Sequence, residues 1–337
     1  MDAAAAAKFT TPLPRLVCSS LCVAAQRVSQ NISSEDAVRR LVQAASGRML
    51  AGGRFFVASN SPGFVTEAMG KGAGLIAAEE YPRSRPSAAD VVIVSWCSAA
   101  CFPPDGAGSC ALETDAMLED LAESQALVVG IGPMATLGGG VLSAAHVIDT
   151  ELSDPLSPRL MLAFGGSAFP IISLANILTL WAFTAELISA CARNGGKMLA
   201  VYQSVLVPGG RERNAARLSR FASGDAFEPG DHWAPLAAAY GELTARYISA
   251  TITALESLNW TKLEAAIQLC GAAVQAGGRV ITYIIGHSPV HHWGTAAGTY
   301  HVGWPGSSRH HRMAGMYRVI TLETTQLPDA AALLSRT

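Results

Sequence analysis

The sequence predicts an α/β protein built on a three-layer, doubly wound parallel sheet. The first observation is a repeat: residues 51–54 read Ala-Gly-Gly-Arg, and the same four residues recur at 276–279, 225 positions later. The second is that each copy closes an amphipathic helical run. The third is that each copy precedes an apolar, β-prone run that ends in small polar residues. Helix, turn, buried strand and polar loop form the opening unit of such a sheet.

The elements of the first half follow each other in the order expected of this class. A helix begins near Ser33 or Ser34 and ends at the first Gly-Gly turn. The later elements are a strand at 55–58, a short helix at 64–71, a short strand at 74–78, a strand at 90–94, a helix at 113–124 and a strand at 126–131. A flexible glycine joint is expected at 138–140.

The second half begins with an expected edge strand at 160–164 and a long apolar helix over 173–192. This helix is long enough to span a membrane, but it carries Asn176 and Glu186 and lies between α/β signals. We therefore expect a buried helix at a subunit interface. A polar stretch over 208–231 predicts a linker, and a helix over about 234–258 leads into the second copy of the repeat.

The expected organisation is an N-terminal arm or helix at 1–32, a domain at 33–222 and a second, partial unit at 234–337. An apolar stretch near the N-terminus is short and interrupted by serines, which favours a frayed arm leading into a helix over a signal peptide. After residue 300 the pattern dissolves, and too few residues remain for a full second sheet.

The composition restricts the possible partners. Only 15% of the residues are charged, against about 25% in a typical domain, so a buried interface in a homo-oligomer, a dimer or tetramer, is expected. A net charge of −2 gives no reason to expect nucleic-acid binding, and no membrane is expected. Seven cysteines without paired spacing favour free thiols in a reducing compartment, here the cytoplasm.

Residues 51–75 resemble the start of SIS (sugar isomerase) domains. They contain a Gly-Gly-Arg turn, a strand, a small polar loop and a helix, and the segment 71–75 fits the family's Ala-Gly-Gly-Leu ending. The likeness continues in the strand and loop at 90–98 and in the apolar helix at 173–192, which the family uses for dimerisation. Residues 207–214 are similar to a motif of an uncharacterised bacterial branch of the family.

The resemblance covers about 40–215 as a full domain, and a second start covers about 240–300, where residues 286–288 read Gly-His-Ser. It implies an SIS-like doubly wound sheet, a second partial SIS-like unit and a sugar phosphate as partner, with no cofactor. The family holds the phosphate with backbone amides and hydroxyl groups at strand ends. The matching positions here are Ser59, Asn60, Ser61, Ser95, Ser98, Gly286, His287 and Ser288.

The polar loops depart from the family's pattern in one respect that bears on ligand binding. Trp96 and Cys97 occupy positions where the family often has small polar residues, and Ser98 replaces a glycine. The indole of Trp96 is large enough to fill the phosphate pocket. Without the resemblance, serines in such turns are more often turn formers than ligand-binding residues.

Aldose–ketose isomerisation needs a base that moves a proton between two carbons. Glu67 lies one turn into the helix after the first loop, and the same offset in the second copy falls on His292. These two residues are the candidate acid and base, although a glutamate in a first helical turn also suits a surface or capping role. Glu186, in the apolar helix, is either a hydrogen-bonded buried residue or a second candidate base.

Six of the eight histidines fall between 287 and 311, and they could serve as acid–base groups, as substrate contacts or in a polar interface. The spacing of His287 and His291 would suit a metal, but no third ligand follows, so no metal site is predicted. The sequence therefore leaves open a phosphosugar isomerase or related enzyme, a non-catalytic phosphosugar-binding regulator, and a structural subunit that has lost its ligand.

Overall fold

The structure is a computed structural model that describes residues 13–59, 64–70, 74–81, 85–96, 120–132, 146–150, 171–204, 207–230, 233, 237–276, 280–283 and 299–302. The chain forms two compact units, Met1–Gln268 and Leu269–Thr337. The predicted α/β class with an all-parallel central sheet is confirmed in the first unit.

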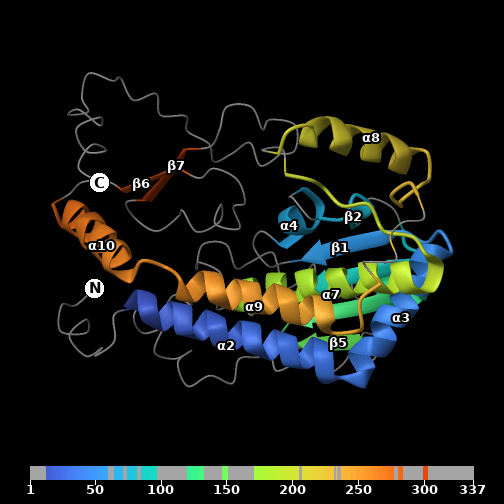
Figure 1. Ribbon diagram of the computed structural model, residues 1–337, viewed down its shortest axis with the longest axis horizontal. Helices are drawn as coiled ribbons and strands as arrows, with labels where there is room; N and C mark the ends of the chain where they lie inside the picture. The colour runs from blue at the N-terminus through green and yellow to red at the C-terminus, as the bar shows by residue number, and fades with distance from the viewer. Residues whose placement is uncertain are drawn as a thin grey trace. The chain divides into compact units, whose positions relative to one another are not determined.

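The central sheet contains five parallel strands in the order β2-β1-β3-β4-β5 (Figure 1). The strands are β1 (Phe55–Ser59), β2 (Ala78–Glu80), β3 (Val91–Ser95), β4 (Leu127–Gly132) and β5 (His146–Asp149). In the centre of the sheet, Phe55 pairs with Val91 and Ser59 pairs with Ser95. The predicted strands at 55–58, 90–94 and 126–131 are therefore confirmed within one residue.

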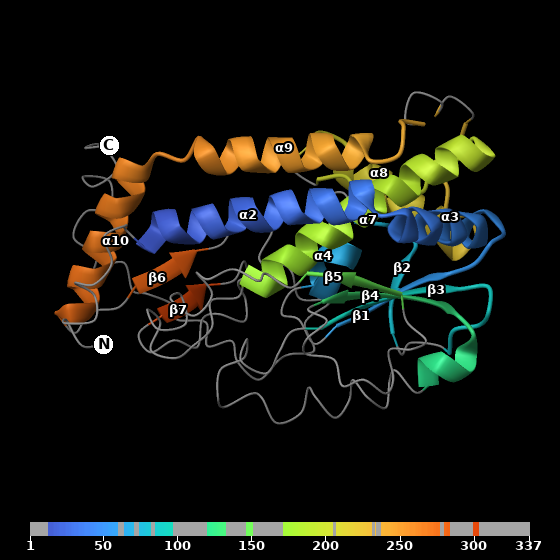
Figure 2. The same ribbon diagram turned by 90° about the horizontal axis from the view of Figure 1, so that it is seen from below.

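Both faces of the sheet are buried, as the continuous apolar runs of its strands require. Because side chains alternate along a strand, Phe55, Val57 and Ile93 belong to one hydrophobic cluster, and Phe56 and Val92 belong to a second. Figure 2 shows the long helices over the first face and a helical segment at 120–124 over the second. The two layers of helices and the sheet between them form the predicted three layers.

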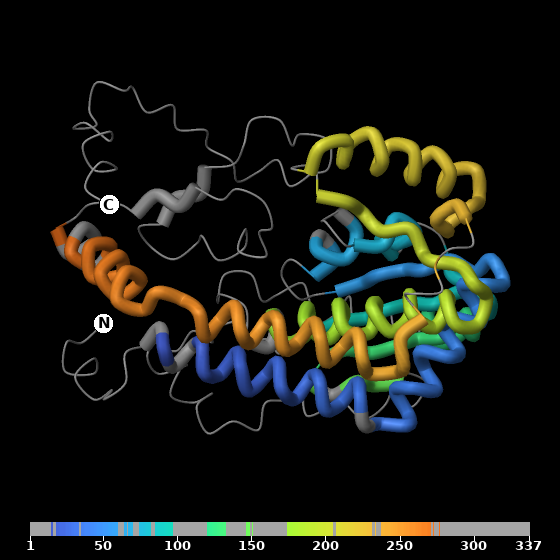
Figure 3. The backbone as a smooth tube through the Cα atoms, viewed as in Figure 1, coloured from blue at the N-terminus to red at the C-terminus, as the bar shows by residue number. Residues whose placement is uncertain are grey.

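Four long helices lie on the side of the first face: α2 (Leu13–Ser34), α3 (Asp36–Leu50), α7 (Ile171–Gly195) and α9 (Glu242–Glu256). Helices α3 and α7 contact the strands, and α2 and α9 pack on α7. Helices α2, α7 and α9 lie side by side (Figure 3), and α3 also packs against α7. The short helix α4 (Phe64–Gly70) lies between β1 and α7.

Helix α7 owes its apolar composition to its position in the core. Among the described residues it is the one helix long and apolar enough to cross a membrane, and 72% of its most apolar window is buried inside the protein. Its neighbours α2, α3 and α9 belong to the same chain. The predicted burial of this helix is confirmed, and its place at a subunit interface stays a prediction.

The first Gly-Gly-Arg turn has a structural explanation at each position. Gly52 has a φ of +89°, which ends α3 in a conformation that favours glycine. A Cβ at Gly53 would lie 2.1 Å from the carbonyl oxygen of Ala89, so only glycine fits there. Arg54 then forms an ion pair of 2.9 Å with Asp90 at the start of β3. The motif therefore joins a helix to the amino end of the sheet.

The strand expected at 74–78 lies later in the chain, because β2 begins at Ala78. Within the expected range before Ala78, Leu75 forms an isolated bridge to Val201 and no strand is present. The reason is a buried turn at Ile76 and Ala77, whose apolar side chains imitate a strand in the sequence. The helix expected over about 234–258 is present as α9, but it begins only at Glu242. The expected elements at 138–140 and 160–164 lie outside the described residues, and β5, which the sequence analysis missed, forms the edge of the sheet.

The prediction of a linker over 208–231 is wrong for most of this stretch, because residues Gly210–Ala222 form helix α8. Asn214 fixes α8 to the preceding segment: its Oδ1 accepts from the backbone N–H of Gln203, and its Nδ2 donates to the carbonyl oxygen of Gln203, both at 2.8 Å. Arg217 also donates to the carbonyl oxygen of Val201. The charged residues that suggested a linker therefore attach a surface helix.

The second unit contains two described strands, β6 (Val280–Tyr283) and β7 (Thr299–Val302), which pair in parallel. Helix α10 (Trp260–Gln275) precedes β6 in the chain and crosses the division between the units. The expected strand after the second Gly-Gly-Arg copy is thus present. Helix α9, which we expected in the second unit, packs on α2 and α7 of the first unit.

Candidate functional site

The strand order places a topological switch point between β1 and β3. Helical connections lead from β1 outward to β2 and from β3 outward to β4, so the carboxyl ends of β1 and β3 flank a crevice where open α/β sheets bind ligands. Ser59 and Ser95 are the last residues of these two strands and are register partners. The structure therefore brings together two of the residues that the sequence predicted as phosphate-binding.

A buried polar network lies beside Ser95 on the face that α7 covers. Asn176, on the first turns of α7, donates from Nδ2 to Ser95 Oγ and to the carbonyl oxygen of Trp96, both at 2.9 Å. The hydroxyl of Thr150, after β5, donates to Asn176 Oδ1 at 2.7 Å. Ser95, Thr150 and Asn176 are all at most 4% exposed. The network therefore fixes α7 to the carboxyl ends of β3 and β5.

Trp96 lies on the opposite face of the sheet from this network. It belongs to the cluster that contains Val92 and Val94, and its ring covers β4 at Gly130 and Gly132. A Cβ at Gly132 would lie 2.5 Å from the ring, so the two glycines make room for the indole. The indole therefore does not fill the Ser95 side of the sheet, which removes the obstacle that the sequence suggested.

Glu67 is a buried residue of α4, with 5% of its surface exposed. The surface role considered for it is therefore wrong. Burial raises the pKa of Tyr247 in α9 to about 12, and the nearby charge of Glu67 contributes to this rise. The carboxylate thus acts electrostatically on α9 from inside the first unit. A buried carboxylate near a strand end is suited to proton transfer as well as to a structural role.

Arg54 and Asp90 lie at the amino edge of the sheet, away from the switch point. The Asp90 carboxylate accepts hydrogen bonds from the backbone and side chain of Arg54 and from the backbone and hydroxyl of Ser87. Burial acts to raise the pKa of Asp90, but these hydrogen bonds outweigh it and hold the pKa below its usual range. Arg54 therefore lies at the edge of the sheet opposite to the candidate phosphate site.

Glu186 has a structural role. Its carboxylate is fully buried and accepts from the backbone N–H groups of Gly241 and Thr244 and from the Thr244 hydroxyl, at 2.9 to 3.1 Å. These groups belong to the first turn of α9, whose N-cap residue Gly241 has no side chain to accept them. Glu186 therefore caps α9 from α7, as the hydrogen-bonded alternative predicted.

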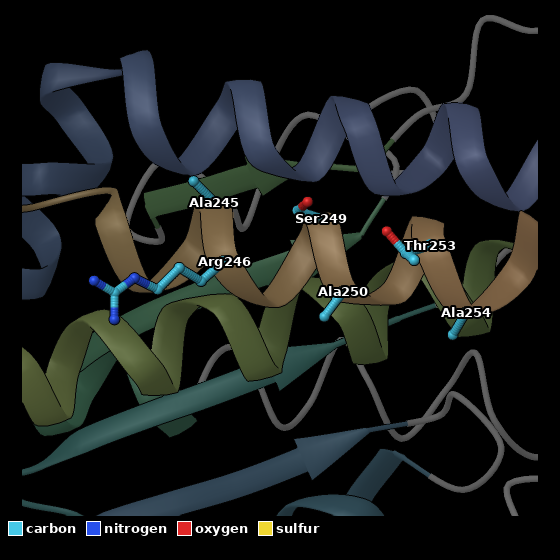
Figure 4. A pocket seen from close by; sticks show the side chains of 6 residues that line it. All are labelled: Ala245, Arg246, Ser249, Ala250, Thr253 and Ala254. Carbon is cyan, nitrogen blue, oxygen red and sulfur yellow. The ribbon is translucent and has the colours of Figure 1, made fainter.

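A groove of about 730 Å³ lies on α9 (Figure 4). It is lined by Ala245, Arg246, Ser249, Ala250, Thr253 and Ala254. Its one charged side chain, Arg246, forms an ion pair with Glu242 on the same helix. The lining contains two hydroxyl groups but no acid or base that could activate them, and the carboxyl edge of the sheet is the better candidate site.

The other predicted site residues lie outside the described residues: Asn60, Ser61, Ser98, Gly286, His287, Ser288 and His292. Within the described part of the chain, no three His, Cys, Asp or Glu side chains are grouped so that they could hold a metal. The sequence analysis missed the roles of Asn176 and Thr150. A polar residue near the start of an apolar helix was the available signal for Asn176, and no comparable signal marks Thr150.

Comparison of the chain with models of known protein families finds no match, and comparison with curated proteins finds none either. The assignment of a function therefore depends on the geometry of the carboxyl edge and on the motifs of the sequence.

Proposed function

We propose that the protein is an SIS-type phosphosugar-binding protein whose site lies at the carboxyl ends of β1 and β3. The single observation that carries this proposal is the pairing of Ser59 with Ser95 at the switch point of the sheet. Ligands of open α/β sheets bind at this point, and hydroxyl groups are suitable donors to phosphate oxygens.

Two further findings support the proposal. Trp96 packs on the face of β4 opposite to Ser95, which leaves the α7 side of the switch point to other groups. The Gly-Gly-Arg turn, the three central strands and the long apolar helix occur in the order that the resemblance implies. We also propose that the first unit has the SIS-like form of this α/β fold and that the second unit is a partial SIS-like unit.

Turnover of the sugar phosphate would need an acid and a base, and Glu67 and His292 remain the proposed residues, one in each copy of the repeat. The position of Glu67 supports a role near the site, because it lies on α4, the helix that directly follows β1. A second candidate is a phosphosugar-binding regulator without turnover, in which the buried Glu67 carboxylate has only a structural role. An isomerase assay on the purified protein separates the two.

A ligand panel tests the proposal directly. Thermal unfolding is measured with hexose, pentose, heptose and amino-sugar phosphates, with the matching unphosphorylated sugars and with inorganic phosphate. A ligand at 100 times its dissociation constant adds about 2.7 kcal/mol of stability. We expect stabilisation by at least one sugar phosphate and not by its unphosphorylated sugar. If no sugar phosphate stabilises the protein, the structural-subunit alternative replaces the proposal.

We also propose a cytoplasmic homo-oligomer. The low content of charged residues supports an oligomeric interface, and the free cysteines Cys18, Cys22, Cys191 and Cys270 support a reducing compartment. Light scattering at micromolar concentration should give at least twice the mass of one chain. A monomeric mass would contradict the oligomer without affecting the fold, because α7 is already covered by helices of its own chain.

A further inference from the structure

The side-chain amide of Asn176 has one possible orientation. The carbonyl oxygen of Trp96 lies 2.9 Å from Nδ2, and a carbonyl oxygen can only accept a hydrogen bond. The amide nitrogen must therefore face Trp96, which turns Oδ1 towards the Thr150 hydroxyl at 2.7 Å. Since Oδ1 carries no proton, Thr150 is the donor of that bond.

This orientation determines how Ser95 forms hydrogen bonds. The second N–H of the Asn176 amide points to Ser95 Oγ at 2.9 Å, so Ser95 accepts in this contact. A serine hydroxyl has one proton besides its acceptor positions, and that proton remains for another partner. No oxygen within the described parts of the chain accepts it. Ser95 is therefore held as a donor at the carboxyl end of β3.

We propose that Asn176 is a positioning residue that keeps the Ser95 hydroxyl as a hydrogen-bond donor, and that the group receiving its proton is a phosphoryl oxygen. A buried donor binds an anionic oxygen about twice as strongly as a neutral one, and Ser95 is 1% exposed. Ser59, its register partner, adds a second hydroxyl at the neighbouring strand end. The inference rests on the proposed phosphosugar function and goes beyond it by naming how the phosphate donor is oriented.

The test compares three variants, with inorganic phosphate, fructose 6-phosphate and unphosphorylated fructose as probes in calorimetric titrations. Ser95→Ala removes the donor and should weaken phosphate binding about tenfold or more. Asn176→Asp should weaken it at least as much, because the new carboxylate accepts the Ser95 proton and turns it away from the ligand. Thr150→Val is the matched control: it breaks the network but leaves the Asn176–Ser95 contact, so binding should change less than about twofold.

Anion binding measured as a function of pH separates a positioning role of Asn176 from a purely structural one. Sulfate keeps a constant charge between neutral and mildly acidic pH, so it replaces phosphate in this experiment. With Asn176→Asp, sulfate binding should recover on acidification, because a protonated carboxyl group no longer competes for the Ser95 proton. The original protein should show no such recovery. If Asn176→Asp does not fold, Asn176→Ala replaces it: it removes the N–H that points to Ser95 Oγ, and it should weaken phosphate binding more than Thr150→Val does.

Each outcome bears on one proposal or on both. Unchanged phosphate binding in Asn176→Asp, or equal losses in Ser95→Ala and Thr150→Val, overturns the positioning role and leaves the phosphosugar function in place. Unchanged binding in Ser95→Ala also removes Ser95 from the proposed phosphate site. Binding of inorganic phosphate that depends on Ser95, without preference for fructose 6-phosphate or other sugar phosphates, overturns the phosphosugar function and supports the positioning role. The absence of any phosphate binding overturns both.

Discussion

Ser59 and Ser95 are register partners at the carboxyl ends of β1 and β3, although 35 residues separate them in the chain. The pairing follows from the parallel arrangement, in which strands that start at the same edge also end at the same edge. Because neighbouring residues in register point to the same face, both hydroxyls lie on the face that α7 covers. The two serines thus lie side by side on one face of the sheet rather than in two separate turns.

The first prediction concerns the contribution of each repeat copy to phosphate binding. Ser59→Ala and Ser288→Ala should each weaken sugar-phosphate binding by about 1 kcal/mol or more, as expected for a lost hydrogen bond to a charged group. The loss should be larger for Ser59→Ala if the phosphate lies at the switch point of the first unit, and larger for Ser288→Ala if it lies in the second loop, where Gly286 lets an anion approach the backbone. Calorimetric titration measures both, and Ser219→Ala, an exposed serine of α8, is the matched control.

A Gly286→Trp variant extends this test by placing a bulky ring in the second loop. If it binds sugar phosphates as well as the original protein does, the phosphate does not lie in the second loop. A loss confined to Ser59→Ala would then assign the site to the switch point of the first unit.

The second prediction concerns turnover. If the protein is an isomerase, Glu67→Gln and His292→Ala should each reduce kcat by about two orders of magnitude or more, the range typical of a lost general acid or base. Ligand-induced thermal stabilisation should persist, because neither change removes a phosphate donor. Coupled-enzyme assays of aldose–ketose exchange measure this effect. Binding without exchange in the original protein would support the regulator instead.

The central strands could be predicted from the sequence because each carries a purely apolar run that only a doubly covered strand can bury. The Gly-Gly-Arg turn was recognisable for a related reason: its geometry needs a positive φ at Gly52 and contact with backbone at Gly53. The position of Ser95 at a strand end followed directly from the end of the apolar run.

The errors arose where tertiary contacts decide the local structure. The polar residues of α8 suggested a linker because two of them, Arg217 and Asn214, bind backbone groups of Val201 and Gln203, and such contacts leave no pattern in the sequence. Asn176 read only as an interruption of an apolar helix, since its partners lie 80 residues earlier and 26 residues earlier in the chain. Trp96 follows Ser95 directly, so the two side chains point to opposite faces of the sheet. Which face each side chain reaches depends on the placement of β3 in the sheet, and the sequence alone did not provide it.

The third prediction concerns acid stability. The pKa of Asp90 lies below its ordinary value in the folded protein, so its ionised form stabilises the fold above the unfolded-state pKa of about 4. This stabilisation is lost as the pH falls through the folded-state pKa. Asp90→Asn should therefore lower the free energy of unfolding by about 2 kcal/mol at neutral pH, and its difference from the original protein should shrink in acid.

Urea denaturation at neutral and acidic pH measures this difference. Asp225→Asn is the matched control, since Asp225 also has a lowered pKa from a hydrogen bond with Arg220 but is exposed. Its effect should be about 0.5 kcal/mol or less. A constant effect of Asp90→Asn across this pH range would contradict the assignment of the ion pair as the cause.

The last prediction concerns the cap that α7 provides for α9. Glu186→Ala removes the acceptor of two backbone N–H groups and one hydroxyl in a fully buried position. Unsatisfied buried donors are costly, so the free energy of unfolding should fall by about 3 kcal/mol, and the amides of Gly241 and Thr244 should exchange with solvent faster. Glu256→Ala, which changes an exposed glutamate at the other end of α9, should lower the free energy of unfolding by about 0.5 kcal/mol or less.

Glu186→Gln should lower the free energy of unfolding by an amount between these two, because the amide retains one acceptor oxygen but brings two donors. If Glu186→Ala abolished isomerase activity at a temperature where it remained folded, while hydrogen exchange in α9 stayed unchanged, Glu186 would be a catalytic base and not a cap.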